Sequence, residues 1–381
     1  MGERRDYSLT GPDAQRAVER GLAQAQWYSP PIDRKDVKDL MRRRDWPAIR
    51  DTFLWLSGMG ISGALAFHDG GHWTAVPFFI VYGILYGSAS DSRWHECVHG
   101  TAFKTHWINE AIYLIACVMI FREPTVWRWS HMRHHTDTLV VGRDTEVEVQ
   151  RPPDALTLAL DMFSLKRVAI AIVRMVQHAS GHLTADERTF VPQHEWWKVA
   201  WDARAGLALL AAVIGVCVAE GSVLPAMFVG LPTLYGGFLG PFFSMTQHTG
   251  LAEDVLDHRL NSRTVYMNPV FRFLYWNMNY HLEHHLFPMV PFHALPRLHA
   301  AVKAHCPPPY RSCWEVYREI IPAVIRQRRD PSWYVRRPLP RPAPDAGPAR
   351  AGDGRDGRPM TAAGTVSRNN GVEARSHGWR P

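Results

Sequence analysis

Residues 73–99 read WTAVPFFIVYGILYGSASDSRWHECVH, an apolar block that leads to two histidines. The apolar part, Trp73–Ala89, contains no Lys, Arg, Asp or Glu, and a membrane-spanning helix needs roughly 17–25 such residues. His95 and His99 follow this block and are four residues apart, so on a helix they lie on one face. The stretch therefore predicts an apolar helix followed by two imidazoles that point the same way.

Three further apolar blocks have a similar composition. They are Thr52–Phe67, Ala203–Ala219 and Val223–Met245, and their only charged residue is Arg204 near one edge. Each block alone fits a buried helix of a soluble bundle, but two close pairs joined by short polar turns favour membrane hairpins. We therefore expect an all-α integral membrane protein with four transmembrane helices in two hairpins.

Basic residues beside the blocks indicate the orientation. Met41–Arg44 contains three arginines and precedes the first block, whereas the turn inside each hairpin has no Lys or Arg. Because cytosolic segments carry the excess of basic residues, both termini and the stretch 90–202 are expected in the cytosol, the latter as a helical cap that carries histidines. The predicted domains are a cytosolic segment 1–50, a membrane domain 51–335 and a disordered Pro/Gly/Arg-rich tail 336–381.

Two stretches between the hairpins are less decisive. Trp107–Phe121 is apolar but too short for a comfortable span, which favours a re-entrant or interfacial helix. Ala155–His178 is amphipathic, and either the membrane surface or the cytosolic cap would accommodate its apolar face.

The charge and cysteine content exclude several functions. The net charge of +7 comes largely from residues near the apolar blocks and in the tail, where anionic lipid headgroups are natural partners, so no nucleic-acid partner is expected. The five cysteines form no CxxC pair, which argues against a disulfide framework and against an iron–sulfur cluster.

Histidines at ligand spacing are the strongest functional signal in the chain. They form three short clusters: His95 and His99; His131, His134 and His135; and His281, His284 and His285. With His248, these are nine of the chain's 20 histidines, and all nine fall on the predicted cytosolic side. Neutral imidazole is the commonest protein metal ligand, so the pattern predicts a multinuclear metal site. His68 and His72 are also four apart, but they lie in the opposite turn and are predicted not to bind metal.

Two other metal-site classes fit part of the pattern. His95-Glu96-Cys-Val-His99 matches the HExxH motif of zinc proteases, in which the glutamate is the general base. Such a site needs one more ligand, whereas this chain has two complete HxxHH clusters. A soluble carboxylate-bridged di-iron bundle would need a second ExxH motif and further glutamates, which the chain does not supply.

The three clusters together resemble those of the membrane fatty-acid desaturase/hydroxylase superfamily of non-haem di-iron enzymes. The third cluster lies within Asn279-Tyr-His-Leu-Glu-His-His-Leu-Phe-Pro288, and the resemblance covers about residues 45–310. It implies two iron ions bound by the nine histidines and dioxygen as co-substrate. It also suggests that the Trp73–Ala89 helix continues into the cytosol and carries His95 and His99. Nearby carboxylates expected to orient the imidazoles are Asp91, Glu96, Asp137 and Glu283.

The same resemblance leaves the reaction open. It implies desaturation of a fatty-acyl or lipid substrate, with hydroxylation or oxidative demethylation as the alternative. The flanks His99–Lys104 and Phe121–Thr138 are most similar to a bacterial branch that includes rhizopine-catabolism hydrocarbon oxygenases. No fused electron-transfer domain is recognised, so a separate donor such as a ferredoxin with its reductase is expected, at the bacterial cytoplasmic membrane.

Overall fold

The computed structural model describes residues 5–23 and 25–340, and within these ranges the chain is helical, with only two isolated β-bridges. The all-α prediction is thus confirmed for this part of the chain. Residues 341–381, most of the predicted tail, lie outside the described ranges. Residues 336–340 are described, and Arg337 among them is buried and donates to the carbonyl of Ser262.

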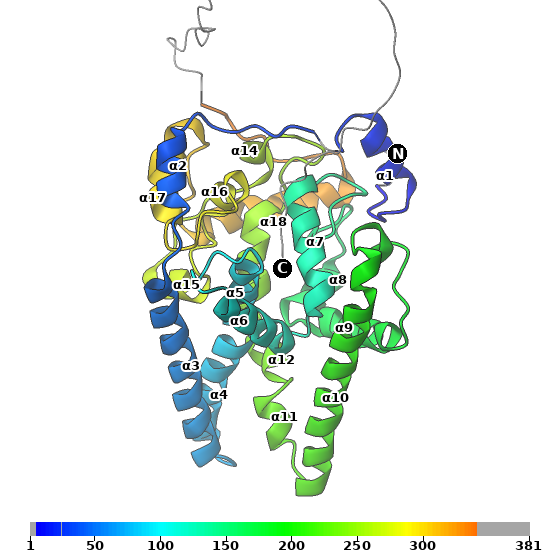
Figure 1. The fold of residues 1–381 in the computed structure, drawn as a ribbon, viewed down its shortest axis with the longest axis vertical. Coiled ribbons are helices and arrows are strands. Elements are labelled where there is room, and N and C mark those ends of the chain that lie inside the picture. The colour runs from blue at the N-terminus through cyan, green and yellow to red at the C-terminus, as the bar shows by residue number, and fades with distance from the viewer. Residues whose placement is uncertain (1–4, 24, 341–381) are drawn as a thin grey trace, which may run out of the picture. The chain divides into compact units, whose positions relative to one another are not determined.

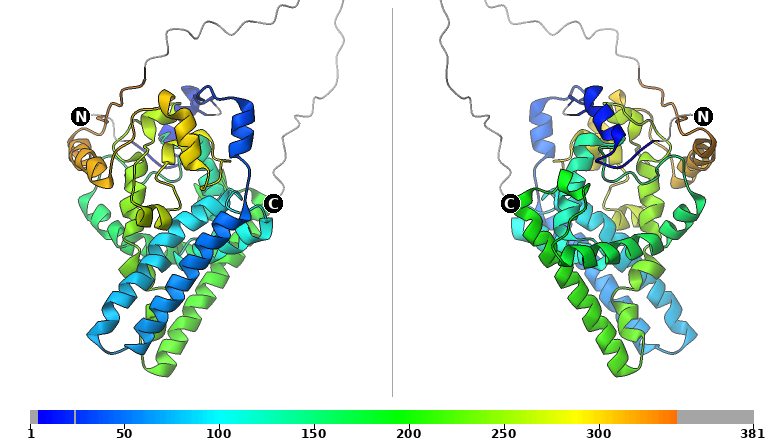
Figure 2. Two further views of the ribbon diagram at one scale, coloured as in Figure 1. Left: turned by 90° about the vertical axis from the view of Figure 1, so that its left-hand side faces the viewer. Right: turned by 90° about the vertical axis from the view of Figure 1, so that its right-hand side faces the viewer.

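Long apolar helices extend from one end of the described unit (Figures 1 and 2). They are α3 (Asp45–His68), α10 (Trp196–Glu220), and the continuous run of η1 (Trp73–Ala75), α4 (Val76–Gly83), η2 (Ile84–Ser88) and α5 (Ala89–Val98). Two helical stretches of the described chain, Trp73–Val98 and Gln193–Ala219, are long and apolar enough to cross a membrane. Large apolar side chains on this end point outward, among them Phe53 and Val218, which are 68% and 76% exposed. Such exposure is typical of a surface that contacts lipid.

The fourth apolar block is not one helix, so its prediction as a single span is wrong. Its residues form α11 (Leu224–Phe228), α12 (Pro232–Gly236) and α13 (Leu239–His248). A proline is the second residue of α11, another begins α12, and a third lies inside α13. Gly230, between α11 and α12, has a φ of +95°. Proline removes a backbone donor and glycine permits this left-handed turn, so the backbone bends although the block is uniformly apolar.

The segment α11–α13 packs tightly against the helical run Trp73–Val98, just ahead of His95 in the sequence. A Cβ on Gly236 would lie 1.9 Å from the carbonyl carbon of Gly83, so only glycine permits this approach. The next turn of this run, η2, is π-helical. The hydroxyl of Ser88 in η2 donates to the carbonyl of Gly236 at 2.7 Å. This contact fixes the position from which α5 carries His95.

Shorter helices form a cap at the other end of the unit (Figure 1). They are α1 (Pro12–Glu19), α2 (Arg34–Leu40), α6 (His106–Met119), α7 (Pro124–Asp137), α8 (Ala155–Met162), α9 (Leu165–Ala179), η3 (Glu187–Thr189), η4 (Gln193–Glu195), α14 (His258–Asn261), α15 (Pro269–Leu274), α16 (His281–Leu286), α17 (Leu295–Val302), η5 (Lys303–His305) and α18 (Cys313–Arg329). The main apolar core lies where α5 and α6 meet the segments around α15 to α17, and it includes the fully buried Trp55, Phe103 and Trp276. This core supports the helices that carry the histidines.

Candidate metal centre

Nine histidines from four separate segments meet in the cap. Two lie at the C-terminal end of α5, three on α7, three on α16, and one ends α13. Each histidine contributes one ring nitrogen to one of two separate groups. The nitrogens within a group all lie within 4.8 Å of one another. The first group is His95, His99, His131, His135 and His284, and the second is His134, His248, His281 and His285. The structure therefore brings together all nine predicted ligands, while His68 ends α3, which extends away from the cap (Figure 1), and belongs to neither group.

The spacing within each group suits a metal ion. The Nε2 atom of His284 lies 3.1 Å from that of His95 and 3.2 Å from that of His135. In the second group, the Nε2 atom of His281 lies 2.8 Å from that of His248 and 3.0 Å from that of His285. Two nitrogens bound at right angles to one ion, at a metal–nitrogen distance of about 2.1 Å, would be about 3 Å apart. The donor sets therefore fit two metal ions.

Burial keeps most of these imidazoles neutral, which is the form that binds metal. Burial, with a smaller repulsion from His134, lowers the pKa of His99 and of His248 to about 3. Burial likewise lowers the pKa of His281 and His285 well below the usual value. Proton competition for the Nε2 atoms is consequently weak at neutral pH.

Two carboxylates that follow α7 orient histidines of the second cluster. The Nδ1 atom of His134 lies 2.9 and 3.1 Å from the two carboxylate oxygens of Asp144, and that of His131 lies 3.1 Å from Oε2 of Glu146. A proton on Nδ1 directed to a carboxylate leaves Nε2 free for a metal. Sequence reasoning missed both residues, and the only local signal is two carboxylates two positions apart soon after the cluster.

Neutral groups orient two further ligands. The Nδ1 atom of His248 lies 2.7 Å from the backbone carbonyl oxygen of Asn261, which requires the Nδ1–H tautomer. The Nδ1 atom of His285 lies 3.2 Å from the hydroxyl of Thr138. Four of the nine ligands thus have a partner that points Nε2 toward its group.

Two of the carboxylates expected to orient imidazoles bind arginines instead, so that prediction is wrong for them. Asp91 lies 3.0 Å from Arg122, and Asp137 lies 2.5 Å from Arg133 and 3.2 Å from Arg143. A guanidinium carries a permanent charge, so it is a stronger partner for a carboxylate than a neutral imidazole.

The other two expected carboxylates are buried on the sides of their helices that face away from the nitrogens. Glu96 accepts hydrogen bonds from the hydroxyl of Thr101 and the backbone N–H of Phe292. Glu283 contacts Nδ1 of His299, a histidine outside both groups, at 2.5 Å. Each glutamate is next in sequence to the ligand face and about 100° around the helix from its neighbour, which explains why it points elsewhere.

A cavity of about 630 Å³, called the chamber below, adjoins the histidines. Its lining includes His95 from the first group and His134 and His248 from the second. Parts of α5, α7, α9, α12 and α13 form its walls. A molecule in the chamber therefore has access to both metal positions.

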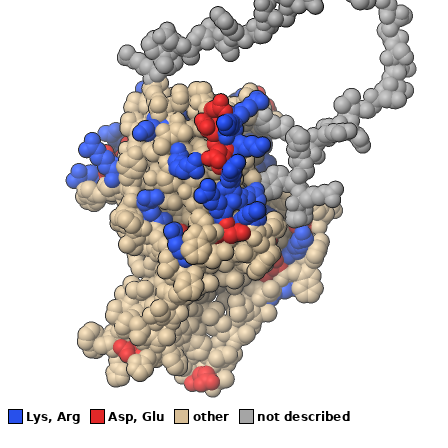
Figure 3. All heavy atoms as spheres, turned by 60° about the vertical axis from the view of Figure 1, so that its left-hand side comes forward, with Lys and Arg blue, Asp and Glu red and all other residues tan. Residues whose placement is uncertain are grey.

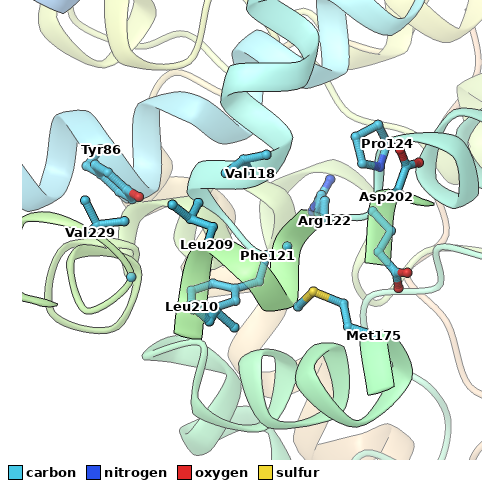
Figure 4. Close-up of a pocket in the computed structure, with 13 residues that line it drawn as sticks. Tyr86, Val118, Phe121, Arg122, Pro124, Met175, Asp202, Leu209, Leu210 and Val229 are labelled. Atoms are coloured by element: carbon cyan, nitrogen blue, oxygen red, sulfur yellow. The ribbon is translucent and has the colours of Figure 1, made fainter. Parts of the chain in front are cut away.

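A second cavity of about 40 Å³ lies at the level of the long helices (Figure 4). Its walls are mostly apolar and include Tyr86, Val118 and Leu209. The corner Phe121–Glu123 lines both this pocket and the chamber. Phe121 holds this corner with a φ of 58°, an unusual value for a residue other than glycine.

Comparison with known proteins agrees with this geometry. The family model described as fatty acid desaturase matches residues 71–317, which contain all nine histidines. The chain is also 22% identical over 244 residues to an acyl-lipid (9-3)-desaturase of Physcomitrium patens. The aligned region covers 56% of this chain and 45% of that protein. The chain thus matches less than half of the length of this relative. Because the family match covers most of the chain, the protein belongs to the fatty acid desaturase family.

Proposed function

We propose that the protein is a di-iron oxidoreductase that uses dioxygen to desaturate a fatty-acyl or lipid substrate at the cytosolic face of a membrane. The two groups of converging Nε2 atoms are the observation that carries the proposal. Iron bound there would supply the redox chemistry that removes hydrogen from an unactivated C–H bond. The balanced reaction takes a –CH2–CH2– unit, O2, two electrons and two protons to –CH=CH– and two waters.

The contribution of the chain is ligand orientation and a chamber for the substrate. Asp144, Glu146, Asn261 and Thr138 hold four imidazoles in the tautomer that presents Nε2. The chamber gives a reacting carbon access to both groups. The same site would support hydroxylation, in which one oxygen atom enters the C–H bond and the other leaves as water. Hydroxylation is the second candidate because the chamber is lined by charged residues, which suit a polar substrate.

The arrangement argues against a zinc protease. The first group offers five nitrogens, whereas catalytic zinc takes about three protein ligands. Glu96, which would be the general base of an HExxH protease, is fully buried and hydrogen-bonded to Thr101 and Phe292, away from the ligand nitrogens. It is therefore not placed to activate a metal-bound water.

Metal analysis and product analysis test the proposal. We expect about two irons per purified chain, one for each group of nitrogens. With a ferredoxin, its reductase and membrane lipids, the product should lack two hydrogens by mass spectrometry, whereas a gained oxygen indicates the hydroxylase. A single zinc with peptidase activity, or a dioxygen-independent product, contradicts the di-iron proposal.

The electron donor is proposed to be a separate acidic redox protein that binds a basic face formed by α2 and α17 (Figure 3). The exposed basic residues of this α2–α17 face are Arg34, Lys35, Lys38, Arg42, Arg43, Arg44, Arg297 and Lys303. Only Asp33, Asp36 and Asp39 oppose them on α2 and its cap. Helix α17 also carries His299, whose Nδ1 contacts Glu283 of the third histidine cluster. The hydrogen bond between His299 and Glu283 therefore connects helix α17 of the basic face directly to helix α16, which carries the third histidine cluster.

Reversing charge on this face should weaken donor binding without altering the metal site. For Lys38→Glu combined with Lys303→Glu, we expect the KM for ferredoxin to rise about tenfold and its dependence on salt to decrease, because rim charges control encounter. Turnover driven by a small chemical reductant should stay at the level of the unaltered protein. Arg328→Glu, an exposed reversal on α18, is the matched control. An unchanged KM in the double variant places the donor elsewhere.

A further inference from the structure

The wall of the chamber is charged, which is not the lining that a bare acyl chain requires. Apart from the two carboxylates that orient imidazoles, six acidic residues line it: Asp91, Glu123, Glu148, Asp161, Asp186 and Glu187. The basic residues of its lining are Arg122, Arg167 and Arg174. A hydrocarbon chain gains free energy by contact with apolar surface and gains nothing by covering ionised groups.

Pairing within the wall leaves an excess of negative charge. Asp91 is paired with Arg122, and Glu148 with Arg167. Glu123 and Glu187 both contact the ring of His178, at 2.9 and 3.0 Å. Burial alone would lower the pKa of His178, but hydrogen bonds to the two glutamates raise it to about 9, so this histidine is charged at neutral pH. Six acids against three arginines and His178 leave a formal charge of −2.

Two buried atoms of the chamber's lining residues have no hydrogen-bond partner among the described residues. They are Oδ1 of Asp161, an acceptor, and Nη1 of Arg122, a donor. The Nε atom of Arg167 lies 3.9 Å from that oxygen, within the range of an ion pair but too far for a hydrogen bond. Buried polar atoms are rarely left unsatisfied, so each is a candidate partner for a complementary group on a ligand.

Arg122 lies close to the metal-binding helices. Its guanidinium is 4.0 Å from the ring centre of Trp94 and 3.9 Å from that of Trp127. The Trp94 ring lies 5.5 Å from His95 and 5.2 Å from His131. A ligand group that accepts from Arg122 is therefore separated from the first group of nitrogens by about one ring.

We infer that the substrate carries a protonated amine and a hydrogen-bond acceptor near the carbon that is oxidised, with the amine at Asp161 and the acceptor at Arg122. Any apolar tail leaves along the Phe121–Glu123 corner toward the apolar pocket in Figure 4. This inference rests on the proposed function, and it assigns oxidation to a position near a polar head rather than to the middle of a chain. The excess of carboxylates selects an amine over a neutral or anionic head.

Binding of short probes tests the substrate class without turnover. Hexylamine, hexanol and hexanoate are titrated by calorimetry into the iron-loaded protein in detergent. We expect hexylamine to bind at least tenfold more tightly than the other two. Equal binding of amine and alcohol, or preferred binding of hexanoate, overturns the inference but leaves the di-iron proposal intact, because iron content and dioxygen consumption are measured separately.

A substitution in the wall locates the amine. Asp161→Asn keeps the shape and removes the charge, so the preference for hexylamine over hexanol should disappear while iron content stays unchanged. Asp69→Asn, at the end of α3 away from the cap, is the matched control and should keep the full preference. A preference retained in Asp161→Asn shows that the amine does not bind at Asp161. The comparison of probes on the unaltered protein remains decisive if this variant folds poorly.

Discussion

His284→Ala is expected to reduce turnover by more than about a hundredfold and to remove the metal ion of the first group. Loss of a residue that only orients a ligand already costs about 10–100-fold, and His284 is placed as a ligand itself. Its Nε2 atom lies close to those of His95 and His135, from two other segments, so the substitution opens the centre of the group. Iron per chain, measured by plasma emission spectrometry, should fall to about half, because the second group keeps its four nitrogens.

His68→Ala is the control for this prediction. His68 ends α3 at the opposite end of the helix from the cap and belongs to neither group of nitrogens. Its removal should leave iron content and turnover unchanged. If His284→Ala keeps a full iron load and elutes as a folded protein, the first group is not a metal site. Size-exclusion profiles of both variants separate loss of metal from loss of fold.

Local spacing was sufficient to predict the eight histidines of the three clusters, because residues three and four apart share a helix face regardless of the rest of the fold, whereas His248 was predicted from the family resemblance. It was not sufficient for the carboxylates that orient them. Glu96 and Glu283 are adjacent to ligands in sequence but bind groups on other segments. Asp144 reaches His134 only because the chain after α7 folds back, and such a contact depends on the whole fold.

The apolar blocks show a similar limit of sequence reasoning. Hydropathy correctly indicated a helix at Trp73–Ala89, because this block has no charged residue and the helical stretch Trp73–Val98 that contains it is long and apolar enough to cross a membrane. It failed at Val223–Met245 because composition does not report the backbone breaks that Pro232 and Gly230 impose. The break has a structural role, since it brings Gly236 into contact with the helix that carries His95.

Asp144→Asn is expected to lower metal affinity or turnover by about 10–100-fold, which is the usual cost of losing a carboxylate that orients a ligand histidine. The substitution keeps a side-chain oxygen within reach of Nδ1 of His134 but removes the negative charge that favours the Nδ1–H tautomer. Competition with a chelator measures the affinity. Asp137→Asn is the matched control, because Asp137 is about as buried and ends the same helix that carries His134, but its side chain pairs with Arg133 and Arg143. Asp137→Asn should lower thermal stability and leave iron affinity unchanged. Equal loss of affinity in both variants would show that Asp144 supports the fold rather than the ligand.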